Sequence, residues 1–518
     1  MAPATATYRR DGYPLDPEVL GTPARPIGMA GNTFTSATDL AAAIRGSERS
    51  PVDVLETHLD RIDERGDRTN AFVTVLAEEA RERAREIEAA IERGEDPGPL
   101  AGVPVAIKDL SDSKAGVRHT YGMAPLAENV ANRTTVAVKR LEDAGAIVLG
   151  TTNTPALGHT VRTDNELQGP TATPFDAERN AGGSSGGSAA ALADGLCALA
   201  MGSDVGGSLR TPAACCGITS IKPSFGVIPR DARPDAFRAH SPFGVIGPMA
   251  RTSEDLALAL EVLAGPDDAD PYSVPRPSGA DGGSYTEAID TTEGAGSLDV
   301  GYSPDLDWFA VEPAVRETID EAIEDLAAAG PTVEEITVNG PEKGEAAAAF
   351  GVQATVLFAT SVAELNEAHE MNLLDDHAAS LSDSFVRTVE MGQGHDALDY
   401  TTADTVRTRL YDAIEESLEN YDALVCPALA TLPLTHEEPL PTEIDGESVS
   451  GLPMDWALSW PFNMTGHPVL TVPAGIAKGL PVGIQIVTKR YDERAALSVA
   501  TVLEKARPWA ETYPALDN

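Results

Sequence analysis

Two glycine- and serine-rich stretches, each set against apolar segments, constrain this chain more than any other feature. The first runs Gly182-Gly-Ser-Ser-Gly-Gly-Ser188 and the second Gly202-Ser-Asp-Val-Gly-Gly-Ser208. The alanine-rich residues between them have the composition of a buried segment. A flexible linker does not usually lie inside a core. Clustered glycines beside a helix start instead let main-chain N–H groups approach and converge on a ligand.

Strand and helix patterns alternate along the chain, which predicts an α/β fold. We expect a large mixed, mostly parallel, twisted β-sheet with helices on both faces. The strand patterns lie at 102–109, 146–149, 196–201, 298–302, 423–426 and 469–487. The helical patterns lie at 36–65, 74–93, 134–144, 188–194, 312–329, 343–420 and 492–506.

Composition along the chain predicts its domain organisation. We expect an N-terminal arm and helices over 1–70, with an extended arm over 1–30, and a catalytic domain over 71–515. Residues 265–296 are rich in Gly, Asp, Pro and Ser, which indicates a loop or linker insertion. Residues 340–420 are predicted to be a helical region beside the substrate pocket.

The charge balance narrows the classes of partner. The chain has 81 acidic and 38 basic residues, a formal net charge of −43, with the acids scattered along it. It should repel nucleic acid and anionic membranes, so neither is an expected partner. Lysine is scarce, eight against thirty arginines. This composition is typical of a salt-accumulating halophile, because molar salt shortens the Debye length to about 3 Å. The alternative is an ordinary acidic cytosolic protein.

Cysteine usage and hydropathy indicate a cytoplasmic location. The four cysteines match neither a zinc pattern nor a disulfide framework, and we expect them to be buried: Cys197, Cys215, Cys216 and Cys426. No segment approaches 18 continuous apolar residues, so no membrane span is expected. Arg9-Arg10 is not followed by the apolar stretch of an export signal.

Lys108 is a candidate base for a serine nucleophile. It is the first lysine of the chain and ends an apolar strand pattern, where burial would lower its pKa. The alternative is a lysine that reaches the surface or pairs with Asp109.

The pattern Gly182-x-Ser184-x-Gly186 also fits the nucleophile elbow of α/β-hydrolases. That mechanism needs a later histidine. His240 and His467 are available, but nothing around either of them is distinctive.

A family resemblance rests on longer segments. Residues 179–229, RNAGGSSGGSAAALADGLCALAMGSDVGGSLRTPAACCGITSIKPSFGVIP, resemble the amidase signature. GVPVAIKDL at 102–110 is similar to the lysine segment of that family, and GPMARTSEDLALALEVLAGPD, FNMTGHPVLTVPAG and GLPVGIQIV also resemble family segments. The similarity extends from about residue 36 to about residue 510. The chain resembles an acidic, haloarchaeal-type member of the amidase signature family.

The resemblance implies a role for each matching residue. Ser208 matches the nucleophile, Ser184 the bridging serine behind a cis peptide, and Lys108 the base. Four consecutive main-chain N–H groups match the oxyanion hole: those of Val205, Gly206, Gly207 and Ser208. Three residues match supporting positions around the nucleophile: Ser185, Asp204 and Arg210.

These residues together predict an amidase that acts on linear amides. Ser208 would attack a carboxamide carbon, and the acyl-enzyme would form with release of ammonia or an amine. A small-molecule amide is the expected substrate. No cofactor is expected, and no metal, because neither His-Glu-x-x-His nor a paired Cys-x-x-Cys occurs. Relatives are often homodimers, but the sequence does not decide the oligomeric state.

Two other functions remain open. The glutaminase component of a tRNA-dependent glutamine amidotransferase shares the fold and the triad, but those proteins usually carry Gln where this chain has Thr211. A non-catalytic scaffold on a decayed fold is the second alternative, and the presence of Lys108, Ser184 and Ser208 counts against it. Thr151 stands where many relatives have Lys.

Overall fold

A computed structural model describes residues 32–233, 235–237, 243–276, 283–289 and 297–516 of the chain. The predicted arm over 1–30 and His240 lie outside the described residues.

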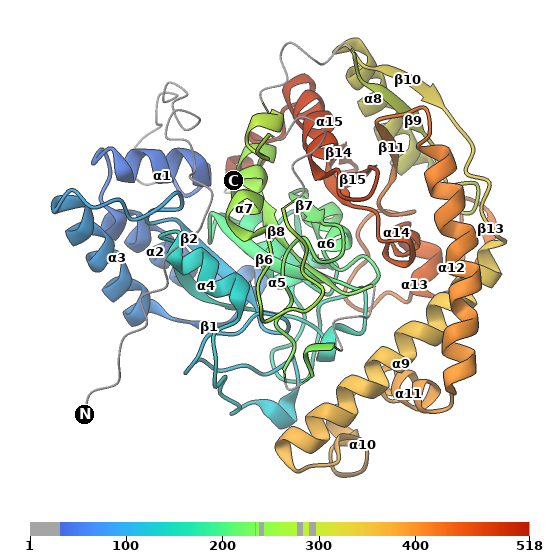
Figure 1. The fold of residues 1–518 in the computed structure, drawn as a ribbon, viewed down its shortest axis with the longest axis horizontal. Coiled ribbons are helices and arrows are strands. Elements are labelled where there is room, and N and C mark those ends of the chain that lie inside the picture. The colour runs from blue at the N-terminus through green and yellow to red at the C-terminus, as the bar shows by residue number, and fades with distance from the viewer. Residues whose placement is uncertain (1–31, 234, 238–242, 277–282, 290–296, 517–518) are drawn as a thin grey trace.

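One sheet of eleven strands forms the centre of the molecule, in the order β1-β3-β2-β6-β8-β7-β14-β15-β11-β9-β10 (Figure 1). In chain order its strands are β1 (Phe72–Val75), β2 (Pro104–Lys108), β3 (Ile147–Thr152), β6 (Leu199–Asp204), β7 (Thr219–Lys222), β8 (Val245–Ala250), β9 (Asp299–Tyr302), β10 (Thr332–Glu335), β11 (Ala423–Pro427), β14 (Val469–Ala477) and β15 (Leu480–Val487). Two short pairs lie outside it: β4 (Ala172–Thr173) with β5 (Asp176–Asn180), and β12 (Glu443–Ile444) with β13 (Glu447–Ser448).

The sheet is mixed, which confirms the predicted α/β class. Parallel pairs lie towards both ends: β3–β2 and β2–β6 on one side, β11–β9 and β9–β10 on the other. The central pairs from β6 to β11 are antiparallel. Here β14 and β15 are joined directly by a tight turn at Lys478 and Gly479, both with positive φ, which suits a hairpin.

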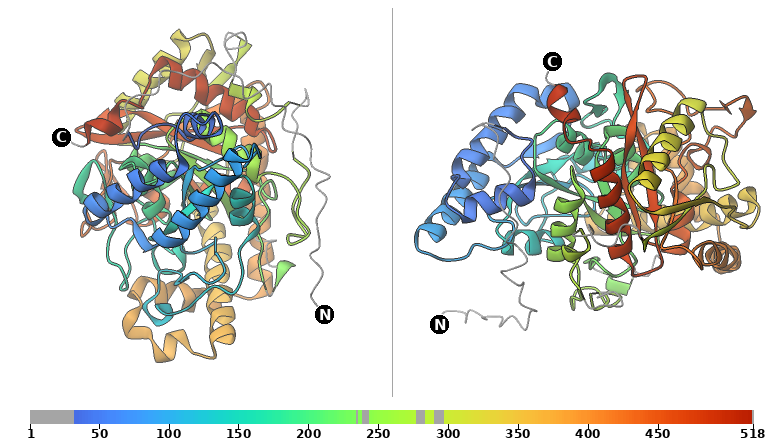
Figure 2. Two further views of the ribbon diagram at one scale, coloured as in Figure 1. Left: turned by 90° about the vertical axis from the view of Figure 1, so that its left-hand side faces the viewer. Right: turned by 90° about the horizontal axis from the view of Figure 1, so that it is seen from above.

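Helices pack on the sheet in separate groups (Figure 2). α7, α15 and α8 contact one another in turn along β8, β14 and β11, and α5 and α6 form a second pair against β6, β14 and β15. The longer helices are α1 (Ala37–Arg45), α2 (Pro51–Thr69), α3 (Ala77–Glu92), α4 (Val136–Asp143), α5 (Gly186–Ala193), α6 (Arg210–Cys216), α7 (Ser253–Leu263), α8 (Pro313–Ala328), α9 (Lys343–His369), α11 (Asp383–Gln393), α12 (Ala397–Ser417) and α15 (Glu493–Ala506). The short ones are α10 (Leu373–Asp376), α13 (Pro453–Trp456), α14 (Trp460–Thr465) and α16 (Thr512–Ala515).

The segment over 265–296 does not separate two sheets. Strands β9, β10 and β11 follow it in sequence and join the same sheet as the strands before it. Residues 340–420 are helical as predicted, and α9 packs against α11 and α12 at the edge of the molecule (Figure 1). By length and composition alone α9 would be apolar enough to cross a membrane, and about a third of its most apolar window is buried in this fold. All four cysteines are buried and unpaired.

Candidate active site

Two neighbouring parallel strands bring the candidate residues together. β2 ends at Lys108 and β6 ends at Asp204, and the carboxyl ends of parallel neighbours meet at the same edge of a sheet. Ser184 lies two residues before α5, and Ser208 lies two residues before α6. Because α5 and α6 pack against each other, the two serine turns lie side by side.

Lys108 is buried and faces the serine turns. Its Nζ lies 2.7 Å from Oγ of Ser184 and 3.0 Å from Oγ of Ser203. Burial lowers the pKa of Lys108 to about 7, although the carboxylates of Asp204 and Asp112 favour its charged form. The alternative pairing with Asp109 is not formed, because that carboxylate accepts hydrogen bonds from the N–H and hydroxyl of Thr120.

Ser184 and Ser208 line one cavity of about 650 Å³. The peptide bond between Gly183 and Ser184 is cis. The N–H of Ser185 donates to the carbonyl oxygen of Ser208 at 3.2 Å, which ties the two turns together. Lys108 lies behind Ser184, away from the solvent that fills the cavity. A lysine, a serine and a second serine therefore follow one another from the core to the cavity.

A buried ion pair braces the turn that carries Ser208. The carboxylate of Asp204 accepts hydrogen bonds from the N–H groups of Gly207 and Leu209, from Arg210 and from the Asn463 side chain. Arg210 also donates to the carbonyl oxygen of Ser459 and to the side chains of Gln485 and Asn463. Burial opposes ionisation of Asp204, but the Arg210 guanidinium and these donors hold its pKa well below the ordinary value.

The amides near Ser208 divide into two groups. The Gly207 N–H donates to Asp204 at 2.7 Å, so it braces the turn, which departs from its predicted place in the oxyanion hole. Gly207 has φ +124°, and a Cβ there would lie 1.9 Å from Oγ of Ser459, so only glycine fits. Within the described part of the chain, no acceptor binds the N–H of Val205, Gly206 or Ser208.

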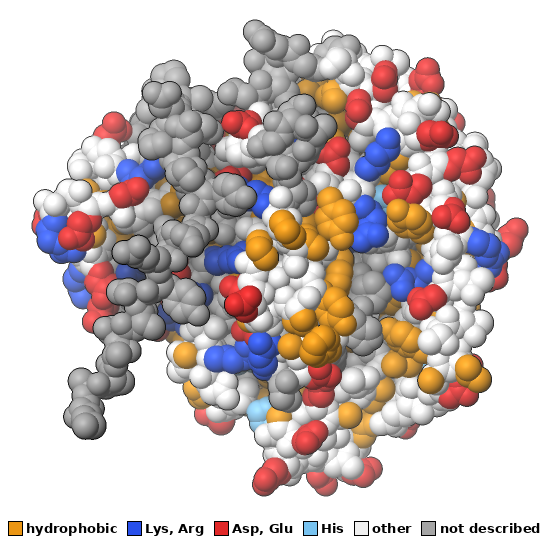
Figure 3. All heavy atoms as spheres, in the orientation of Figure 1, with side chains coloured by type: hydrophobic (Ala, Val, Ile, Leu, Met, Phe, Trp, Pro, Cys, Tyr) orange, Lys and Arg blue, Asp and Glu red, His pale blue; other side chains and the backbone are white. Residues whose placement is uncertain are grey.

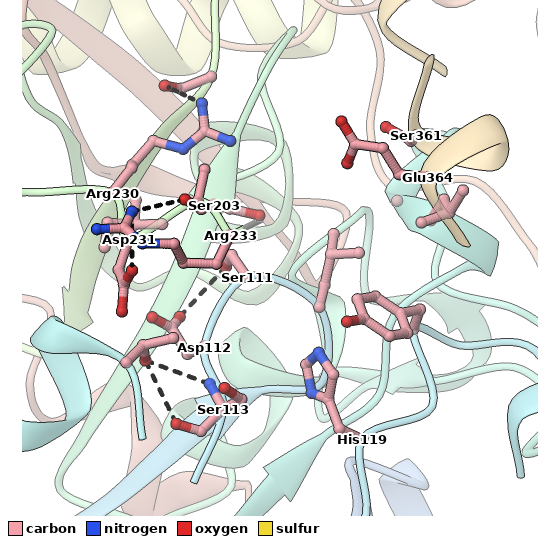
Figure 4. Close-up of a pocket in the computed structure, with 18 of the residues that line it drawn as sticks. Ser111, Asp112, Ser113, His119, Ser203, Arg230, Asp231, Arg233, Ser361 and Glu364 are labelled. Atoms are coloured by element: carbon pink, nitrogen blue, oxygen red, sulfur yellow. Dashed lines mark hydrogen bonds and ion pairs between the residues drawn. The ribbon is translucent and has the colours of Figure 1, made fainter. Parts of the chain in front are cut away.

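The cavity has a polar and an apolar wall (Figure 4). The polar groups come mainly from the turn after β2 and the segment before β8: Ser111, Asp112, Ser113, His119, Arg133, Arg230, Asp231 and Arg233. The apolar groups come from several elements, α9 among them: Leu157, Val205, Val245, Ile246, Leu357, Phe358 and Leu365. Such a cavity suits a small molecule with one apolar and one hydrogen-bonding part.

His467, the remaining candidate for an elbow-type triad, is not part of this cavity. Its ring is buried, with Nε2 3.0 Å from Glu415 and Nδ1 2.8 Å from the Thr465 hydroxyl. A Ser184–His467 arrangement is therefore absent. No cluster of three or more His, Cys, Asp or Glu side chains suited to a metal ion occurs among the described residues.

Several residues of the site carry no signal in the sequence. Ser203 contacts Lys108, and Ser459, Asn463 and Gln485 contact Arg210 from segments about 250–275 residues away. Only Ser203 lies inside a stretch singled out from the sequence, beside Asp204. The others become partners only when β15 and α14 pack against α6.

Replacing Asp204 with asparagine should cost about 3–5 kcal/mol of unfolding free energy, because Arg210 would stay buried without its counter-ion. Urea denaturation of wild type and Asp204→Asn measures this. The control is the double variant Asp204→Asn/Arg210→Met, whose loss should be smaller than the sum of the single losses. A loss below about 1 kcal/mol for Asp204→Asn would contradict the bracing role.

Comparison with known proteins agrees with this site. The Amidase family matches residues 53–497. An acylamidase of Rhodococcus erythropolis is 36% identical over 486 residues, which are 93% of this chain and 97% of that protein. The glutamyl-tRNA(Gln) amidotransferase component GatA-type chain of Carboxydothermus hydrogenoformans is 33% identical over 510 residues, 93% and 99% of the two chains. The crystal structure of a bacterial aryl acylamidase of the amidase signature family superposes with a TM-score of 0.87 at 31% identity, covering 93% of this chain and 98% of that one. The chain belongs to the amidase signature family and is a hydrolase that acts on amides.

Proposed function

We propose that this enzyme hydrolyses a small acyl amide through Ser208, Ser184 and Lys108, with an acyl-enzyme on Ser208. The observation that carries the proposal is the 2.7 Å contact between Nζ of the buried Lys108 and Oγ of Ser184, at the back of the cavity that Ser208 lines. A base held against one serine and screened from solvent can activate a second serine that faces the substrate.

The relay has four steps. Neutral Lys108 takes the hydroxyl proton of Ser184, Ser184 takes the proton of Ser208, and Oγ of Ser208 attacks the amide carbon. The oxyanion accepts hydrogen bonds from the free amides of Val205, Gly206 and Ser208, which act as preorganised donors. The same relay returns a proton to the leaving nitrogen, the C–N bond breaks, and ammonia or an amine departs. Water then hydrolyses the ester on Ser208 and frees the acid.

The free-standing amidase is favoured over the amidotransferase glutaminase by Thr211. Its side chain is buried under the Ser208 turn, and its N–H donates to the carbonyl oxygen of Gly207 at 2.7 Å. Amidotransferase glutaminases usually carry Gln at this position. The similarity to a glutamyl-tRNA(Gln) amidotransferase chain keeps that function as the second candidate, which would require partner chains.

Release of ammonia or amine from a panel of amides in molar potassium chloride tests these two functions. The panel should contain aliphatic amides, anilides and glutamine. Turnover of simple amides or anilides by the isolated chain supports the proposal. Turnover of glutamine alone, or activity that requires co-purifying chains, would support the amidotransferase function instead.

We also propose a cytoplasmic, halophilic enzyme in which the helical region over 340–420 shapes the substrate pocket, with a homodimer as its expected assembly. Acidic side chains are spread over the face shown in Figure 3, in keeping with the net charge of −43. Cavity-lining residues of α9, such as Phe358 and Leu365, support the pocket role.

Potassium chloride should stabilise the fold, because screening weakens the repulsion among the acidic side chains. The midpoint of thermal unfolding should rise by more than about 5 °C between 0.1 M and 3 M salt. Differential scanning calorimetry measures this shift. Sucrose is the control, because it stabilises folded chains without screening charge. A midpoint that is constant or falls with salt, while sucrose raises it, would contradict the halophilic character.

A further inference from the structure

A second carboxyl group lies in the cavity, and the relay does not use it. Asp112 follows Lys108 by four residues, just after the turn that leaves β2, and its side chain is fully buried. It lines the same cavity as Ser184 and Ser208. Its Oδ2 accepts a hydrogen bond from the Ser111 hydroxyl at 3.2 Å (Figure 4). Its Oδ1 is buried and has no hydrogen-bond partner among the described residues.

An acceptor left without a donor is unusual at a buried position. Buried polar groups in folded proteins are nearly always hydrogen-bonded, so an exception points to a missing partner. Burial raises the pKa of Asp112 to about 7, although Ser111, Lys108, His119 and Arg230 favour its charged form. A donor from a bound molecule would satisfy Oδ1 and stabilise the carboxylate.

The chemistry of the proposed relay indicates which donor this is. Ser184 must return a proton to the leaving nitrogen, so that nitrogen lies on the Ser184 side of Ser208 when substrate is bound. Asp112 lies on this side as well, because it belongs to the segment that follows Lys108 and their charges influence each other. The nitrogen of a primary or secondary amide carries an N–H, which an ester oxygen lacks.

We propose that Oδ1 of Asp112 accepts a hydrogen bond from the N–H of the leaving nitrogen, and that Asp112 is a substrate-binding residue that favours primary and secondary amides over esters. The bond holds the nitrogen with its N–H turned towards Asp112, so that its lone pair faces Ser184 for protonation. The inference rests on the proposed function, since it takes the direction of proton return from the relay.

The test compares a 4-nitroanilide with the 4-nitrophenyl ester of the same acyl group. In Asp112→Asn the Ser111 hydroxyl should hold the amide oxygen, so that the amide NH₂ replaces Oδ1. The value of kcat/KM for the anilide should then fall about 10- to 100-fold, the loss expected for a hydrogen bond to a charged group. The value for the ester should change less than about 3-fold, because the ester has no N–H to lose.

The control variant is Asp231→Asn, which removes a carboxylate from the same cavity. The oxygens of Asp231 already pair with Arg133 and Arg233, so the anilide-to-ester ratio should stay as in the wild type. If Asp112→Asn does not fold, Asp112→Ala is measured with the anilide and its N-methyl derivative. Its preference for the N–H substrate should be smaller than that of the wild type.

Three results would overturn the inference: an equal fall for anilide and ester, an unchanged anilide rate, or an undiminished N–H preference in Asp112→Ala. Failure of the proposed function looks different. In that case hydrolysis by an otherwise wild-type chain would persist in Ser208→Ala, whatever the Asp112 variants do.

Discussion

Ser208→Ala should lower kcat for amide hydrolysis by at least about 10³-fold, because no other side chain is placed to form the acyl-enzyme. Ser208 lines the cavity, with free N–H groups beside it and the Lys108–Ser184 pair behind it. Removing its hydroxyl leaves the cavity and the donors in place. Substrate binding should therefore persist while chemistry stops. Steady-state release of 4-nitroaniline from an anilide, together with substrate affinity by calorimetry, separates the two.

The matched control for Ser208→Ala is Ser113→Ala. Ser113 lines the same cavity, but its hydroxyl donates to the carbonyl oxygen of Arg133, away from the relay. Its kcat should stay within about 3-fold of the wild type. A Ser208→Ala enzyme that retains more than about a tenth of the wild-type kcat would contradict the assignment of the nucleophile.

Lys108→Met should lower kcat/KM by about 10²–10⁴-fold, the range for loss of a general base. Lys108→Arg should be as inactive, since an arginine side chain stays protonated and cannot accept the Ser184 proton. The pH dependence gives a second readout. Lys108 must be neutral to act, and its pKa is about 7, so kcat/KM of the wild type should rise with pH through about 7 and level off above.

The residual activity of Lys108→Met should lack this rise. Lys139→Met is the control, because Lys139 lies exposed on α4, and its pH profile should match the wild type. The double variant Lys108→Met/Ser208→Ala should be no less active than Ser208→Ala, because residues of one relay are not additive. A wild-type profile that is flat between pH 6 and 8 would contradict the role of Lys108 as base.

Local signals predicted many of the elements. Ser36 and Ser50 accept hydrogen bonds from main-chain N–H groups and cap α1 and α2, where the sequence indicates helix starts. The run ending at Lys108 forms β2 as expected. The antiparallel centre of the sheet was harder to predict. β7 and β8 are short and are separated by a segment without a described α-helix, so strand–helix alternation says nothing about their direction.

The linear motifs predicted the residues near Ser208, but not their partners. Lys108 and Ser184 are 76 residues apart in sequence and meet as expected from the resemblance. Gly207 differs, because its N–H is turned to Asp204 by the brace that Arg210 and Asn463 complete. Asn463 lies 259 residues from Asp204, so nothing local reveals the pair. Asp112 is likewise visible as a ligand-binding candidate only through its burial and its unpaired oxygen.

The most direct test of the account is to trap the acyl group. The enzyme is mixed with excess 4-nitroanilide, quenched in acid within the first turnovers, digested and examined by mass spectrometry. The account predicts the mass of the acyl group on the peptide that contains Ser208, and no such adduct in Ser208→Ala. An adduct on Ser184 or on another residue, with Ser208 unmodified during active turnover, would contradict it.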